Sequence, residues 1–121
     1  MLRPLTSAEA YLKEAEEFLA KGDTVNASEK YYKAVEEAIK ILALKNNIKA
    51  LKEAKEKGEW DLKLLNDAVD ELAKIYGDRI ITDWSAAVSL ITLNLSIEAI
   101  KELSAYVMDI VKLASTNKEM A

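Results

Sequence analysis

The 121-residue chain contains neither cysteine nor histidine. Without cysteine it has no disulfide framework, no thiolate zinc site and no thiol nucleophile. The missing histidine removes the commonest general base and the commonest metal ligand. The sequence therefore predicts no catalytic residues, no metal and no cofactor, and we expect a protein that is not an enzyme.

Proline and glycine are also scarce, with one proline and three glycines. Few turn residues favour long regular elements over a sheet with many tight turns. Hydrophobic residues make up 50% of the chain, which is enough for one packed core at this length. These features predict a single all-α domain that covers residues 1–121.

Long apolar runs and a strongly basic composition are absent as well. No stretch approaches the roughly 20 apolar residues that span a bilayer, and the N-terminus lacks the apolar segment of a signal peptide. The net charge of −4 provides no basic field for phosphate binding. We therefore expect a cytoplasmic protein with no membrane partner, and the composition disfavours a dedicated nucleic-acid binder.

Residues 6–44 carry the pattern of two antiparallel helices. Thr6 begins a capping box at the start of the first helix, Gly22 supplies the left-handed residue that ends it, and Asp23 or Thr24 can cap the second. Apolar and small residues recur at helical spacing in both segments. The sequence therefore predicts a helical hairpin at the N-terminus.

The turn of this hairpin has the residue spacing of a tetratricopeptide (TPR) unit, because Gly-Asp is followed by Ala27, Tyr31 and Ala34. A second Lys-Gly pair lies close to the roughly 34-residue period of a solenoid, but Lys63 stands where a small residue is needed. A single repeat cannot bury its own face. We therefore expect the TPR-like hairpin to begin a closed bundle of about five helices.

The rest of the chain divides at asparagine and glycine signals. Residues 45–60 predict a short helix and a connection, residues 61–116 the remaining helices, and residues 117–121 a frayed tail. The segment 80–95 is apolar nearly all the way round, which is typical of a helix that is central or covered by a partner. We expect a homodimer that uses this helix. The predicted packing or interface residues are Tyr32, Trp84, Val88, Ile91 and Leu95.

A basic stripe is one candidate for ligand binding. Lys45, Lys49 and Lys52 lie at i, i+4 and i+7, an arrangement that can contact nucleotide or nucleic-acid phosphates. Acidic residues interleave with these lysines, so a solvated surface is the more ordinary interpretation.

The second candidate is Arg79 with Asp83, which lie one helical turn apart. They are candidate ligand contacts, although a plain i,i+4 ion pair is the default interpretation. A stripe of small hydroxyl residues follows them, and close helix packing is favoured over a polar cavity for this stripe. If a pocket exists, we expect it beside Arg79, Asp83 and the stripe. The stripe consists of Ser85, Ser89 and Thr92.

The segments "GD…ASEKYYKAVEEAIK" and "WSAAVSL" resemble the archaeal PaREP family of small helical proteins over nearly the whole chain. That family in turn resembles the HEPN (higher eukaryotes and prokaryotes nucleotide-binding) class of bundles. The resemblance implies homodimers, and either ribonuclease activity, nucleotide binding or partnership with a nucleotidyltransferase. The nuclease motif of that class is an arginine followed after four to six residues by a histidine. Arg79 matches the arginine, but the chain has no histidine, so the nuclease activity is not implied here.

Two functions follow from these observations. The first is a non-enzymatic helical binding or assembly module, which includes the role of partner subunit to a separate catalytic chain. The alternative is a HEPN-like nucleotide- or RNA-binding protein that lacks the Arg–His motif and uses Arg79 and the lysine stripe as contacts.

Overall fold

The structure is a computed structural model that describes residues 3–116. Within this range the chain forms six α-helices and no strand. The helices are α1 (Ser7–Ala20), α2 (Thr24–Asn46), α3 (Lys49–Lys57), α4 (Leu62–Tyr76), α5 (Arg79–Thr92) and α6 (Ile97–Ser115). The all-α bundle is confirmed, with six helices where about five were expected. The tail predicted at residues 117–121 lies outside the described residues.

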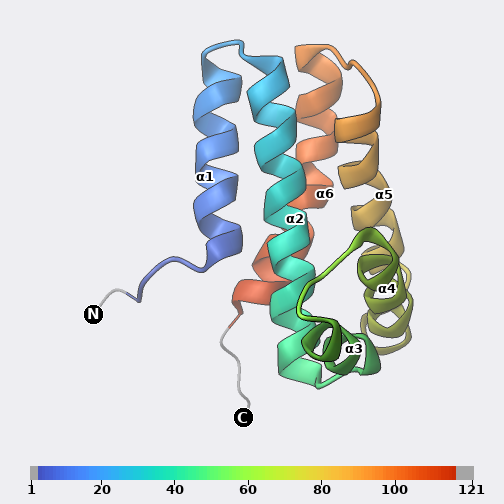
Figure 1. The fold of residues 1–121 in the computed structure, drawn as a ribbon. Coiled ribbons are helices and arrows are strands. Elements are labelled where there is room, and N and C mark those ends of the chain that lie inside the picture. Colours follow the sequence, from blue (N-terminus) through green and yellow to red (C-terminus); the bar gives the residue numbers. More distant parts are fainter. Residues whose placement is uncertain (1–2, 117–121) are drawn as a thin grey trace.

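Helix α2 is the centre of the bundle. It packs against each of the other five helices, and Figure 1 shows α1 antiparallel to it on one side, with α5 and α4 on the other. Helix α6 returns along α2 and also contacts α1 and α5. The chain is therefore a closed bundle that begins with a helical hairpin.

Local capping explains where four of the six described helices begin. The Glu9 N–H donates to the Thr6 hydroxyl at 3.1 Å, and the Glu9 carboxylate accepts the Thr6 N–H at 2.9 Å, which completes the predicted capping box. Asp23, Asp61 and Ser96 cap α2, α4 and α6 by accepting a backbone N–H three residues later. These starts depend on neighbouring residues alone.

Residues with positive φ separate consecutive helices. Asn47, with φ 48°, lies between α2 and α3, and Gly77, with φ 95°, lies between α4 and α5. Glycine and asparagine tolerate positive φ better than other residues. The break at Asn47 is sharp enough that α3 forms as a helix of its own.

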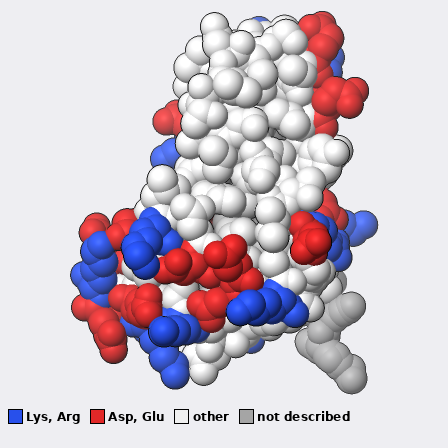
Figure 2. Space-filling view, turned by 90° about the vertical axis from the view of Figure 1, so that its right-hand side faces the viewer, with Lys and Arg blue, Asp and Glu red and all other residues white. Residues whose placement is uncertain are grey.

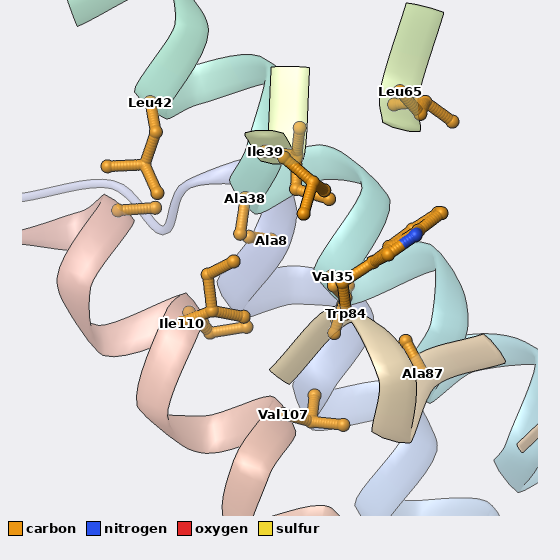
Figure 3. Packing of buried hydrophobic residues seen from close by; sticks show 14 of the residues in the cluster. Ala8, Val35, Ala38, Ile39, Leu42, Leu65, Trp84, Ala87, Val107 and Ile110 are labelled. Atoms are coloured by element: carbon orange, nitrogen blue, oxygen red, sulfur yellow. The ribbon is translucent and has the colours of Figure 1, made fainter. Parts of the chain in front are cut away.

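The core combines alanines with larger aliphatic side chains. Ala8 of α1 lies next to Ala38 of α2 in Figure 3, and both are fully buried. Ile110 on α6 and Trp84 on α5 fill the space on either side of these alanines. Small residues between α1 and α2 let their backbones approach, while α5 and α6 supply the bulk.

In the part of the chain that the structure describes, no helix is both long enough and apolar enough to cross a membrane.

Candidate functional site

The outward side of α5 is an uncharged helix face. From Trp84 to Ile97 the sequence has no charged residue. The inward side of α5 is buried in the core. The outward residues are exposed or half-buried, and we call them the α5 outer face: Ile81, Thr82, Ser85, Val88, Ser89 and Thr92.

Three of the four hydroxyl groups on the α5 outer face bond back to their own helix. The Ser89 hydroxyl donates to the Ser85 carbonyl oxygen at 3.0 Å, and the Thr92 hydroxyl donates to the Val88 carbonyl oxygen at 2.8 Å. Because these donors already have partners, burying the face leaves few polar groups unsatisfied. The face can therefore accept close packing as an apolar helix would.

Charged residues are distributed unevenly over the side of the molecule that carries α5 and α4. Figure 2 looks onto this side, and its upper part shows a broad area free of Lys, Arg, Asp and Glu. Charges of both signs gather below it, over α3 and α4. This side is therefore divided into an uncharged region at α5 and a mixed-charge region at the other end.

A groove adjoins the α5 outer face. It has a volume of about 500 Å³ and lies between the start of α2 and the connection from α5 to α6. Val25 is 75% exposed there, and Ile91 and Leu93 are about half exposed. Glu29 is the one charged residue that lines it, and Thr92 belongs to both the groove and the face. The groove therefore extends the uncharged surface beyond α5.

Trp84 fixes α5 against two other helices. Its ring centroid lies 5.8 Å from that of Tyr32 on α2, in a tilted arrangement, and its indole N–H donates to Asn66 Oδ1 on α4 at 2.8 Å. Val88 and Leu95 are half-buried against the core. Trp84 is thus a core residue. A partner contact at the other predicted interface residues stays a prediction: Tyr32, Val88, Ile91 and Leu95.

Arg79 pairs across helices. Its guanidinium donates to both carboxylate oxygens of Asp109 on α6, at 2.7 and 3.2 Å. The default expectation that Arg79 pairs with Asp83 is wrong, because Asp83 turns inward beside α6 and is only 2% exposed. The pair joins the first turn of α5 to the last part of α6.

Asp83 is a buried carboxyl group beside a second one. Its Oδ2 atom has no hydrogen-bond partner when the group is counted as a carboxylate. Burial, followed by hydrogen bonding to Asp109 and the negative charge of Asp109, raises the pKa of Asp83 to about 8, and Arg79 opposes this rise. Hydrogen bonds from Arg79 and Asp83 lower the pKa of Asp109. At neutral pH, Asp83 is therefore a neutral acid and Asp109 an anion.

Lys45 is occupied within the protein. Its ammonium donates to the carbonyl oxygens of Ala114 at 2.7 Å and Thr116 at 2.8 Å, at the end of α6. Cations stabilise the C-terminal ends of helices. The structure therefore gives Lys45 a structural role.

Lys49 and Lys52 are exposed on α3, among acidic neighbours. The Lys49 ammonium lies 4.0 Å from a Glu53 carboxylate oxygen. The Glu71 carboxylate on α4 accepts the backbone N–H groups of Lys49 and Ala50, both at 2.9 Å, and so caps the first turn of α3. The predicted lysine stripe is therefore divided, because Lys45 bonds α6 whereas Lys49 and Lys52 lie in a surface of mixed charge. Contact of Lys49 and Lys52 with nucleic acid stays a prediction.

The structure thus places the candidates at three separate positions. The α5 outer face is one, the cluster of Arg79, Asp83 and Asp109 is the second, and the exposed lysines of α3 are the third. The sequence led us to expect a pocket beside Arg79, Asp83 and the hydroxyl stripe. The groove touches that stripe only at Thr92, at the opposite end of α5 from Arg79. Among the described residues, no three carboxylates are placed to hold a metal ion.

Sequence reasoning missed Asp109 as a partner of Asp83. The signal was present, because Asp83 is the one charge between Ile80 and Ile97 and Asp109 is the one charge between Leu103 and Val111. A single carboxyl group within each of two apolar helices indicates a buried pair. That these two residues meet depends on how α5 lies against α6.

These features define a class: small, closed α-helical bundles with an uncharged face on one helix. The model of the archaeal PaREP1/PaREP8 family matches residues 3–111. The chain belongs to this family.

Two solved structures are similar to this chain. The crystal structure of a protein from Sulfolobus solfataricus has 42% sequence identity and a TM-score of 0.85, over 92% of this chain and 95% of that one. The solution structure of the Orf c02003 protein also has 42% identity, with a TM-score of 0.78, over 90% of this chain and 88% of that one. Among curated proteins the comparison found no match.

Proposed function

We propose that this protein is a non-enzymatic assembly module that binds a second copy of itself through the α5 outer face. The observation that carries the proposal is the absence of charge on a helix face that lies at the molecular surface. Extended uncharged patches on small proteins commonly mark interaction sites. A cytoplasmic location is part of the proposal.

A second copy is the occupant that suits this face best. In a two-fold dimer the same patch meets itself, so any charge near the centre would lie close to its own copy. The α5 outer face has none, and three of its four hydroxyl groups already donate within their own helix. Two α5 helices can therefore cross closely at Ser85 without like charges meeting.

The proposed interface combines the α5 outer face with the adjoining groove. A stable interface takes about 800 Å² from each partner, which is about a ninth of the 7083 Å² that the chain exposes. A helix as long as α5 extends over about 20 Å. The groove adds the exposed apolar side chains of Val25, Ile91 and Leu93 to the surface that the dimer would bury.

Substitutions on the face test the proposal. Ser85→Arg places a long cation at the centre of the α5 outer face, where its copy in the partner would repel it. Lys52→Ala on α3 is the matched control, because it changes an exposed residue outside the face. By size-exclusion chromatography with light scattering, we expect the mass of two chains for the unchanged protein and the control, and the mass of one chain for Ser85→Arg. A dimer that survives in a folded Ser85→Arg protein would contradict the proposal.

Binding of RNA or nucleotides, as in the HEPN class, is the alternative. Its remaining support is the exposure of Lys49 and Lys52, and the carboxylates around them weaken it. Titration with single-stranded RNA at low salt should give no saturable signal. Saturable binding that is lost in the double variant Lys49→Ala, Lys52→Ala would favour the alternative. A monomeric protein that forms a defined complex with a different chain would instead identify it as a partner subunit.

A further inference from the structure

We propose that Asp83 and Asp109 share one proton, and that the resulting hydrogen bond holds the first half of α5 against α6. Ionisation of the pair in mildly alkaline solution breaks this bond and weakens the contact between the two helices. The inference concerns the contact between α5 and α6 within one chain and does not depend on dimer formation.

The Asp83 carboxyl group lies in the contact between α5 and α6. Asp83 is 2% exposed, and its Oδ2 atom has no partner as a carboxylate. An isolated carboxylate in such a place is strongly disfavoured. Arg79, one turn before Asp83 on α5, donates to both carboxylate oxygens of Asp109 on α6, which places the Asp109 carboxylate beside Asp83. A protonated Asp83 can donate its O–H to the Asp109 carboxylate, which gives the buried carboxyl group a partner.

Arg79 decides which of the two acids keeps the proton. Its guanidinium makes two hydrogen bonds to Asp109, and these favour the charged form of that residue. Asp109 is also the more exposed of the pair. The proton therefore resides on Asp83, and the cluster is an acid, a carboxylate and a guanidinium with a net charge of zero.

Few charged groups affect the pKa of Asp83. Among the described residues, Arg79 on α5 and Asp109 on α6 are the charged groups that act on its pKa. Helices α2 and α4 also pack against α5, but no charged group from either contributes. When Asp83 loses its proton, two adjacent carboxylates face one guanidinium, and the hydrogen bond between the helices is lost.

The direction of the pH effect follows from the raised pKa. An unfolded Asp loses its proton near pH 4, whereas folded Asp83 keeps it up to about pH 8. Below pH 4 both states are protonated, so the stabilising contribution is fully present there. As pH rises through this window the folded state weakens, by up to about tenfold in the unfolding constant per pH unit, and the contribution is gone above pH 8. The pKa of folded Asp109 is lowered by its hydrogen bonds from Arg79 and Asp83, so the contribution of Asp109 to stability changes near and below pH 4.

The absence of histidine makes this titration easier to observe. The sequence has no histidine, and histidine is the side chain that ordinarily titrates between pH 5 and 8. The ordinary pKa values of Asp, Glu, Tyr and Lys side chains lie outside this range.

The test is a carbon-13 NMR titration of the aspartate side-chain carboxyl groups of the full chain. We expect one carboxyl signal with a midpoint near pH 8, absent in Asp83→Asn. In Asp109→Asn we expect the Asp83 midpoint to fall by more than one pH unit, because the neighbouring charge is gone and an amide donor takes its place. If every aspartate of the unchanged protein titrates below pH 6, Asp83 and Asp109 do not share a proton at neutral pH and the proposal is wrong.

Stability measurements provide the second readout. The Asp83→Asn amide can donate to Asp109 as the protonated acid does, but it does not titrate. Urea unfolding should therefore show a flatter dependence on pH between 5 and 8 for Asp83→Asn, while the exposed control Asp70→Asn keeps the slope of the unchanged protein. Equal slopes in all three proteins would overturn the proposal. If Asp83→Asn fails to fold, the NMR titration of the unchanged protein decides alone.

Discussion

Trp84 on α5 donates its indole N–H to Asn66 on α4, across 2.8 Å. The two helices are consecutive and are joined by the short turn at Gly77 and Asp78. The hydrogen bond joins the two helices at a second point, about one and a half turns into α5 and about three turns before the end of α4. It also satisfies the one polar atom of a side chain that otherwise belongs to the core.

Replacing Trp84 by Phe should remove this bond and leave Asn66 without its partner. We expect a loss of about 1–3 kcal/mol in the free energy of unfolding, measured by urea denaturation with circular dichroism. In a double-mutant cycle with Asn66→Ala, the two losses should add to more than the loss of the double variant. Strict additivity would show that the two side chains do not interact.

Glu71 caps α3 from a different helix, and this contact explains how a short helix without a side-chain cap of its own is stable. Glu71→Ala should free the backbone N–H groups of Lys49 and Ala50 and destabilise the protein by about 1–2 kcal/mol. Hydrogen exchange should accelerate at the first turn of α3 more than elsewhere. Asp70→Ala, one residue earlier and exposed, is the control. Unchanged protection at Lys49 and Ala50 in the Glu71 variant would be contrary to this role.

Lys45 should matter for stability and not for ligand binding. Lys45→Met keeps much of the aliphatic stem but removes the donor to the carbonyl groups of Ala114 and Thr116. We expect a loss of about 1 kcal/mol in the free energy of unfolding, and faster hydrogen exchange in the last turn of α6. Lys52→Met should change neither quantity. If both substitutions behave alike, the contact of Lys45 with α6 does not persist in solution.

Acid should weaken the N-terminal capping box. Hydrogen bonds from Arg3 lower the pKa of Glu9 to about 2, and the Thr6 N–H acts in the same direction. A lowered pKa means that the stabilisation is present above about pH 4.5 and is lost as pH falls towards 2. Glu9→Gln should remove this part of the acid dependence, with an effect of about 1 kcal/mol because Arg3 is half exposed. Thermal unfolding between these pH values measures it, with Glu17→Gln as control, and equal acid dependence in both variants would refute it.

Features that depend on a few neighbouring residues could be predicted from the sequence. The capping box at Thr6 and the cap at Asp23 formed where the sequence predicted them, and α2 ends at one of the asparagine signals. The core position of Trp84 followed from the apolar pattern of its helix. Such features need no knowledge of how the helices pack.

The contacts between distant residues could not be predicted in this way. Arg79 has a carboxyl group one turn away on its own helix and still bonds Asp109, 30 positions later. The choice depends on the rotation of α5, which turns Asp83 into the seam with α6. Glu71 likewise meets the start of α3 only because α4 folds back beside it. Periodicity gives the face of a helix but not the partner that the face meets.

Sedimentation equilibrium of the unchanged protein over a dilution series tests the central proposal most directly, because it reports mass in free solution without a substitution. We expect the mass of two chains at micromolar concentration, which falls towards that of one chain on dilution, whereas Ser85→Arg should have the mass of one chain throughout. The mass of a single chain at every concentration of the unchanged protein would contradict self-assembly through α5.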